Sequence, residues 1–81
     1  DSGISNLTNL KRLHILGNIS NMGLKNLTNL EFLSIGLNNE VTNDGIKHLT
    51  KLTSLYTSES KITTEVIPYL PKLSLFNGNK I

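Results

Sequence analysis

The chain has 81 residues and no cysteine, so it is the size of one small domain and cannot form disulfides, thiolate metal sites or a thiol nucleophile. Its net charge is +2, and its basic residues are spread along the chain, the largest cluster being the pair Lys11 and Arg12. Because binding of nucleic-acid phosphates requires a concentrated basic stripe, this distribution argues against a nucleic-acid partner.

A short leucine motif occurs four times along the chain. Its copies, 20 to 22 residues apart, are Leu7-Thr-Asn-Leu10, Leu27-Thr-Asn-Leu30, Leu49-Thr-Lys-Leu52 and Leu70-Pro-Lys-Leu73. A recurrence this regular indicates a solenoid, in which each repeat buries its apolar side against its neighbours. The motif therefore predicts the architecture and an extended binding surface, but it leaves the partner unidentified.

The first segment, residues 1–9, is predicted to be a partial repeat. Asp1–Leu7 matches Asn43–Leu49 almost position for position, and the second of these segments has the pattern of a helix start. The chain is therefore expected to begin inside a repeat, at its helix. Such a start favours a piece of a longer array, with the alternative that another copy of the chain covers the exposed end.

Residues 10–29 and 30–51 are the next two predicted repeats, each a short strand, a turn and a short helix. In the first of them Leu13 and Ile15 alternate with exposed residues, which is the period of a strand, and later apolar residues recur at helical spacing. Helix caps are expected at Ser20, Thr42 and Thr63. Stacked repeats of this kind form a parallel sheet with the helices on its opposite face.

Residues 52–72 are the third full repeat, in which Thr57 takes the place of the earlier isoleucines and Pro68 falls near the end of the helix. We therefore expect weaker packing in this repeat and a shortened or kinked helix. Residues 73–81 are a degenerate last repeat that has lost about two residues relative to the others. It ends straight after a strand without a polar capping unit, which predicts an exposed apolar edge.

One polar side chain per repeat is expected to be buried where the chain leaves the strand. These residues are Asn18, Asn38, Ser60 and Asn79. An asparagine amide both donates and accepts hydrogen bonds, so it can satisfy backbone groups that helix and sheet leave unpaired. We therefore predict a structural ladder of polar side chains, with Ser60 as its weakest member.

The repeat resembles the leucine-rich repeat signature L-x-x-L-x-L-x-x-N, which Leu10-Lys-Arg-Leu13-His-Ile15-Leu-Gly-Asn18 follows. Val41–Leu49 resembles the variable half of the cysteine-containing and related bacterial subclasses, and the Leu-Thr-Asn-Leu runs resemble those of bacterial internalin-type repeats. The resemblance covers residues 1–81. It implies an α/β fold, a right-handed solenoid with parallel strands on its concave face and short helices on its convex face.

In such a fold, the residues that flank the buried strand positions project from the concave face. Alignment of the repeats predicts four rows: Arg12, Phe32 and Ser54; His14, Ser34 and Tyr56; Leu16, Gly36 and Ser58; Gly17, Leu37 and Glu59. Aromatic residues and arginine are the usual anchors of protein interfaces. The candidate partner-binding residues are therefore Arg12, His14, Leu16, Phe32, Ser34, Leu37, Ser54, Tyr56 and Glu59. In the alternative interpretation, Leu16 and Leu37 pack on the rim and only Phe32 and Tyr56 are exposed.

A catalytic or metal-binding role finds little support. His14 beside Ser34 has the residue types of a base and a nucleophile, and adjacent parallel strands lie about 4.8 Å apart. However, no acidic residue is placed to orient His14, and an open sheet excludes no water. His48 lies on the helix side, so it cannot share a metal with His14. We therefore expect no enzyme activity, no metal and no cofactor.

The location of the protein is weakly constrained. No apolar run approaches the roughly 18 residues of a membrane span, so no membrane partner is expected. The absence of cysteine slightly favours the cytoplasm over an animal extracellular setting. A bacterial surface or secreted location stays open, as does a targeting segment removed before Asp1.

The sequence thus favours a non-catalytic interaction module that binds a protein or peptide through its concave face. One alternative is a substrate-recognition segment of an F-box-type ubiquitin-ligase subunit, which an F-box-like helical segment before Asp1 in the parent chain would support. A second alternative is a structural repeat that self-associates through uncapped ends.

Overall fold

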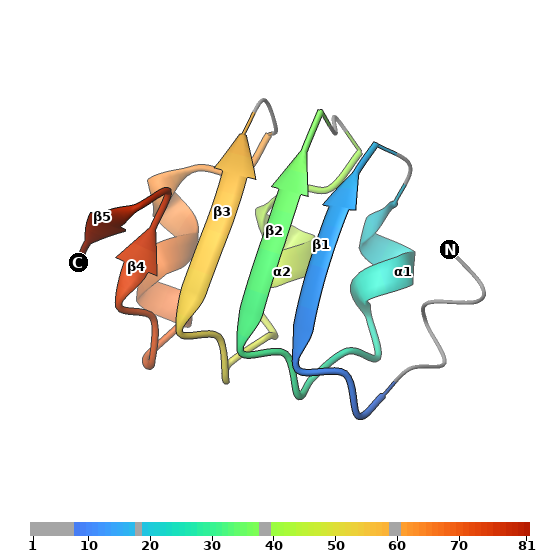
Figure 1. Cartoon of the computed structure of the whole chain (residues 1–81), viewed down its shortest axis with the longest axis horizontal. Helices are drawn as coiled ribbons and strands as arrows, with labels where there is room; N and C mark the ends of the chain where they lie inside the picture. The colour runs from blue at the N-terminus through green and yellow to red at the C-terminus, as the bar shows by residue number, and fades with distance from the viewer. Residues whose placement is uncertain (1–7, 18, 38–39, 59–60) are drawn as a thin grey trace.

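The computed structural model describes residues 8–17, 19–37, 40–58 and 61–81. Their sheet has the strand order β1 (Arg12–Leu16), β2 (Phe32–Gly36), β3 (Ser54–Ser58), β4 (Leu75–Phe76) and β5 (Asn79–Lys80). Strands β1 to β4 are parallel, and β5 pairs with β4 in the antiparallel direction. Figure 1 shows the helices on one face of the sheet: α1 (Asn21–Leu24), α2 (Asn43–Ile46) and the 3₁₀ helix η1 (Thr64–Tyr69). The predicted parallel sheet with short helices on one face is confirmed.

The core lies between the sheet and the helices. Every second strand residue faces it, and Leu33 of β2 is aligned with Leu13 of β1 and Leu55 of β3. Leu33 and Leu55 are fully buried, whereas Leu13 is only half-buried because it lies on the edge strand β1. Burial of apolar side chains against the neighbouring units is therefore the main source of stability, as expected for stacked repeats.

The recurring leucine motif forms the path from each helix back to the sheet. The backbone N–H of Leu27 donates to the carbonyl of Leu24 at 3.2 Å, and that of Leu30 donates to Leu27 at 3.2 Å. The next two units repeat these bonds, from Leu49 to Ile46, Leu52 to Leu49, Leu70 to Ile67 and Leu73 to Leu70. Turns that close over three residues keep residues i and i+3 on one side, which explains the spacing of the leucines.

Asparagine side chains bridge neighbouring units at the start of each helix. The side chain of Asn21 donates to the hydroxyl of Thr42 at 3.0 Å and accepts from the backbone N–H of Thr42 at 3.0 Å. Asn43 makes the same two bonds with Thr63, at 2.9 and 3.0 Å. The structure places Ser20, Thr42 and Thr63 at the predicted cap positions, but only the Thr63 side chain caps its own helix, by accepting from Glu65 N–H at 3.3 Å.

The last unit keeps the register of the earlier units at the start of its strand. Leu75 is aligned with Ser54 and Phe76 with Leu55, so Phe76 occupies the core position that leucine fills in the earlier units. Phe76 and Leu73 are 9% and 8% exposed. The strand therefore begins in the regular register, and the deviation from the repeat comes after Phe76.

A tight hairpin follows Phe76 and covers the edge of β4. Asn77 and Gly78 have φ angles of 52° and 82°, and two consecutive positive φ values are typical of the type I′ turn that joins antiparallel strands. The hairpin pairs Phe76 with Asn79, and the N–H of Ile81 donates to the carbonyl of Ser74 at 3.0 Å. The prediction of an exposed apolar edge after the last strand was wrong for this end of the sheet.

The predicted polar ladder needs a correction at its last position. Asn79 is exposed in β5, because the hairpin carries it to the edge of the sheet. Asn77 is bonded to the preceding unit instead: its side-chain oxygen accepts from the backbone N–H of Thr57 at 2.6 Å, and its amide donates to the Thr57 hydroxyl at 3.2 Å. Thr57 thus has a polar partner at a position where isoleucine packs in earlier units. The other three predicted ladder residues, Asn18, Asn38 and Ser60, lie outside the described residues.

Candidate interaction surface

The face of the sheet that carries no helices is the candidate binding surface. We call it the open sheet face, formed by the outward strand residues Arg12, His14, Leu16, Phe32, Ser34, Gly36, Ser54, Tyr56 and Leu75. Outward residues alternate with core residues along each strand, because successive strand side chains point to opposite faces. The exposed and half-buried positions of β1 follow this alternation.

The observed register gives the first three predicted rows of this surface. Arg12 pairs with Phe32 and Phe32 with Ser54, His14 with Ser34 and Ser34 with Tyr56, and Leu16 with Gly36 and Gly36 with Ser58. In the fourth row, the N–H of Gly17 donates to the carbonyl of Gly36 at 3.0 Å, so Gly17 follows the end of the strand. Glu59, the last member of that row, lies outside the described residues.

Three side chains of the open sheet face form one continuous stack. The guanidinium carbon of Arg12 lies 4.5 Å from the centre of the Phe32 ring. The Phe32 ring in turn lies 5.5 Å from the ring of Tyr56, tilted by 42°. These rings are diagonal neighbours on adjacent strands, a separation that aromatic side chains can span. The stack therefore fixes an arginine and two aromatic rings across three strands.

Two leucines at the carboxyl end of the strands are exposed. Leu16 is 66% exposed and Leu37 is 64% exposed, whereas Phe32 and Tyr56 are half-buried. The alternative in which the leucines pack on the rim was therefore wrong. A methyl group of Leu16 lies above Gly36, since a Cβ added at Gly36 would come within 2.7 Å of it. The glycine gives Leu16 room to lie over the sheet.

Leu37 has an unusual backbone conformation. Its φ is 50°, in the left-handed region, and the preceding unit has Gly17 at the same place with φ of 90°. This region is costly for a bulky side chain and suits glycine. The chain therefore holds an exposed, apolar side chain where a glycine would fit the backbone better.

The structure places the candidate base His14 and the candidate nucleophile Ser34 on adjacent strands. The two residues are aligned, but the His14 side chain makes no hydrogen bond or ion pair with any described residue. Across the described ranges, no group of three or more His, Cys, Asp or Glu residues could hold a metal ion. In the same ranges, no helix is long and apolar enough to cross a membrane.

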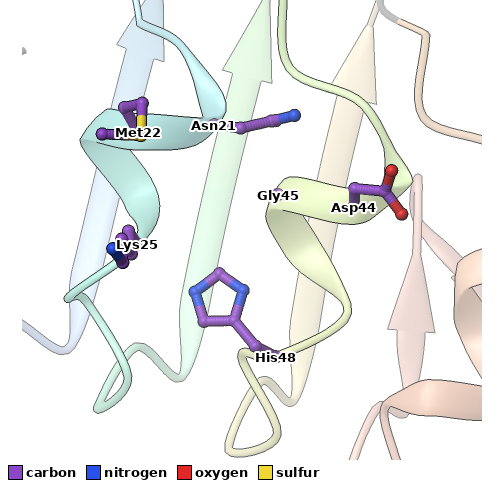
Figure 2. A pocket seen from close by; sticks show the side chains of 6 residues that line it. All are labelled: Asn21, Met22, Lys25, Asp44, Gly45 and His48. Carbon is purple, nitrogen blue, oxygen red and sulfur yellow. The ribbon is translucent and has the colours of Figure 1, made fainter.

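The helix side has a shallow hollow that the sequence did not suggest. It measures about 300 Å³ and is lined by Asn21, Met22, Lys25, Asp44, Gly45 and His48. Figure 2 shows the His48 ring between the two helices, with Asn21 reaching from α1 toward the start of α2. The Nε2 atom of His48 lies 3.2 Å from the carbonyl oxygen of Leu24, so the imidazole ties the second helical segment to the first. The two residues are 24 positions apart, and their contact depends on how the units stack, so no local sequence signal indicates it.

One pair of opposite charges on the helix side, Lys47 and Asp44, is in direct contact. Lys47 lies 3.1 Å from the carboxylate of Asp44 and 5.7 Å from the ring centre of Tyr69. The hydrogen bond with Asp44, followed by its negative charge, raises the pKa of the Lys47 amine above its ordinary value. This exposed pair neutralises itself, so it offers a weaker anchor than an unpaired charge.

Comparison with known proteins gives one similar solved structure. No family model matches the chain, and no curated protein matches it. Among solved structures, the chain is similar to the crystal structure of an internalin C2 from Listeria monocytogenes, with a TM-score of 0.72 and 36% sequence identity. The match covers 89% of this chain and 33% of the internalin chain.

The chain has a leucine-rich-repeat-like fold. The similarity to an internalin supports this part of the sequence-based resemblance. This chain spans about a third of the length of that internalin chain, as the 33% coverage states. The handedness of the coil and the curvature of the sheet stay predictions.

Proposed function

We propose that the chain is a non-catalytic interaction module of the leucine-rich repeat class, which binds a protein or peptide through the open sheet face. In this proposal the repeats coil right-handed and the open sheet face is concave. The similarity to an internalin supports protein binding as the general class of function. The observation that carries the proposal is the stack of Arg12, Phe32 and Tyr56.

The stack has the properties of a preformed interface anchor. Its rings are held against each other and are half-buried, so little side-chain entropy remains to be lost on binding. Aromatic residues and arginine supply most hot spots of protein interfaces. Exposed Leu16, 66% accessible on the same face, extends the apolar surface toward the carboxyl ends of the strands. An extended segment lying across β1, β2 and β3 would contact all of these side chains.

Catalysis is left out of the proposal for a physical reason. A serine hydroxyl needs a base that is itself oriented, and His14 has no side-chain partner among the described residues. The open sheet face also leaves a reacting group in water, where oxyanion stabilisation is weak. In this proposal His14 contacts the ligand and does not act as a base.

Selection of peptide ligands tests the proposed surface. A random-peptide display library is panned against the 81-residue chain, and recovered peptides are measured by titration calorimetry against wild type and variants. We expect Phe32→Ala and Tyr56→Ala each to weaken binding by about 1–3 kcal/mol, because each removes a ring of the stack. Met22→Ala is the matched control, since Met22 is 69% exposed on the helix side.

The control separates the two sides of the molecule. Peptides that keep full affinity for both ring variants but lose it with Met22→Ala would move the binding surface to the helix side. Recovery of no peptide above background would also count against an interaction module. Circular dichroism of each variant shows whether a loss of affinity accompanies a loss of fold.

A further inference from the structure

The cation of the stack is placed for a ligand of opposite charge. The Arg12 side chain packs over the Phe32 ring and makes no hydrogen bond or ion pair with any described residue. Two other basic side chains have partners: Lys47 lies 3.1 Å from Asp44, and Lys51 donates to Asn29 at 2.8 Å. An arginine has five N–H donors in a planar fork, and stacking on a ring occupies its face but not its edges. Arg12 therefore presents unused donors in a fixed position.

The strand positions of the open sheet face around Arg12 carry no negative charge, although the exposed Glu31 lies directly before β2. Among the strand residues of the open sheet face, the others are neutral or histidine, and none is acidic. A guanidinium on such a surface gives a local positive potential, which attracts an anionic group of a ligand. Its planar donor edge fits the two oxygens of one carboxylate, whereas recognition of a phosphate dianion usually uses a cluster of arginines. The chemistry at Arg12 therefore favours a monoanionic carboxylate.

The aromatic rings beside Arg12 favour a ligand that has an apolar side chain near its acidic residue. Phe32 lies next to the guanidinium and Tyr56 lies beyond it on β3, so an apolar group of the ligand would sit over the rings. The Arg12 guanidinium lies 4.5 Å from the Phe32 ring centre, which lies 5.5 Å from the Tyr56 ring centre, and an extended peptide advances about 3.3 Å per residue. Side chains two positions apart, about 6.6 Å, point to the same face of an extended peptide, so an acid on Arg12 and an apolar side chain over the rings are two positions apart in the ligand.

We infer that the open sheet face recognises an acidic peptide segment, in which an Asp or Glu carboxylate binds Arg12 and an apolar residue two positions away binds Phe32 and Tyr56. The inference rests on the proposed function and adds the chemical class of the partner. Arg12 holds the carboxylate through its donor edge, and the aromatic rings exclude water on one side of the ion pair. A peptide that runs in the opposite direction, with its apolar residue before its acid, would make the same two contacts.

A pair of blocked synthetic peptides tests the inference. One has the sequence Gly-Glu-Ser-Leu-Gly, and its matched partner has glutamine in place of glutamate. Each is titrated into the isotope-labelled 81-residue chain by NMR, following the Nε–H signal of Arg12 and the amides of Phe32 and Tyr56. We expect saturable shifts at these signals with a Kd on the order of 1 mM for so short a ligand. The glutamine peptide should bind at least about tenfold more weakly, because it lacks the charge-assisted bonds.

Two charge variants make the test specific. Arg12→Gln and Lys11→Gln each remove one positive charge from adjacent exposed residues. We expect Arg12→Gln to abolish the preference for glutamate over glutamine and Lys11→Gln to keep it. Equal effects of both variants would show a nonspecific attraction and overturn the inference. Arg12→Lys should give a smaller preference, because a lysine cannot bind a carboxylate through two parallel bonds.

Other outcomes are equally decisive. Equal affinity for both peptides, or no shift with either, overturns recognition of an acid at Arg12. A phosphoserine peptide that binds more tightly than the glutamate peptide would assign the site to phosphate and also overturn it. The proposed function is tested separately: library peptides that lack an acidic residue but depend on Phe32 would leave the binding surface standing and remove only the carboxylate.

Discussion

The two faces of the sheet differ in how much their residues change from one unit to the next. In one core row that faces the helices every residue is apolar: Leu13, Leu33, Leu55 and Phe76. The neighbouring positions on the open sheet face are Arg12, Phe32, Ser54 and Leu75, and no two are alike. Both sets belong to the same strands and alternate along them.

This difference separates two physical demands. A position facing the helices must fill a space of nearly constant shape in every unit, and protein interiors tolerate little change in volume. A position on the open sheet face has solvent beside it, so packing does not decide its side chain. Variety there is free to serve recognition, which agrees with the stack of Arg12, Phe32 and Tyr56 lying on this face.

Replacement of adjacent residues on β2 gives the largest expected contrast. Leu33 is 0% exposed, so Leu33→Ala should lower the free energy of unfolding by roughly 2–5 kcal/mol through lost burial and a cavity. Ser34 lies next to it on the open sheet face, and Ser34→Ala should change stability by less than about 0.5 kcal/mol. Urea denaturation followed by circular dichroism measures both.

Equal losses in the two variants would remove the distinction between the faces. Should Leu33→Ala fail to fold, Ile35→Val makes the same comparison with a smaller expected loss of stability. Ile35 is 1% exposed, and removal of one buried methyl group costs about 0.5–1.5 kcal/mol.

Two buried glycines give the next largest contrast. A Cβ added at Gly45 would overlap the side-chain oxygen of Asn21, which is held by its bonds to Thr42. Gly45→Ala should therefore destabilise the chain by about 1–3 kcal/mol. A Cβ at Gly36 would meet only the end of the exposed Leu16 side chain, which can move away. Gly36→Ala should stay within about 1 kcal/mol of wild type, and thermal unfolding compares the two.

A double variant identifies the cause of the Gly45 effect. In an Asn21→Ala background the amide is gone and only the Cβ of residue 21 stays close, 3.1 Å from the added carbon, so Gly45→Ala should destabilise much less than in the wild type. Additive losses in the double variant would mean that Asn21 is not what makes glycine necessary.

The fold could be predicted from the sequence because its main signals are redundant. Leucines spaced by three residues specify the return path, and alternation in the strands fixes their register, since a slip of one residue would turn every core side chain outward. The rows that place Arg12 beside Phe32 follow from that register. The contact between Phe32 and Tyr56 does not, because it depends on which rotamers the two rings adopt.

The end of the sheet was mispredicted because residues 77–79 were interpreted as part of a regular repeat and not as a hairpin turn. Asn77-Gly78 between two short strands is a strong hairpin signal, but the expected repeat assigned the neighbouring Asn79 to a buried ladder. The bridges from Asn21 to Thr42 and from Asn43 to Thr63 join residues 20 or 21 positions apart. Such bonds depend on the exact offset between stacked units, which single-sequence patterns do not give.

The smallest expected change tests whether the chain after the end of β2 tolerates backbone strain in order to display an apolar side chain. Leu37 has φ of 50° and is 64% exposed, so its backbone is unfavourable and its side chain contributes little burial. Leu37→Gly should relieve the strain at some entropic cost, and we expect a net stabilisation of about 0.5–1 kcal/mol. The urea midpoint measures this gain. The same variant should bind the library-selected peptides more weakly, since it removes an exposed apolar contact.

Leu16→Ala is the matched control for this trade-off, because Leu16 is 66% exposed and lies in a regular strand. It should weaken peptide binding without raising the urea midpoint, since no backbone strain is relieved. A gain of stability in both variants would mean that exposed leucines are unfavourable for another reason than backbone conformation. A loss of stability in Leu37→Gly would show that the Leu37 side chain packs against the protein. Leu37 would then count as a residue that stabilises the fold and not as one displayed for binding.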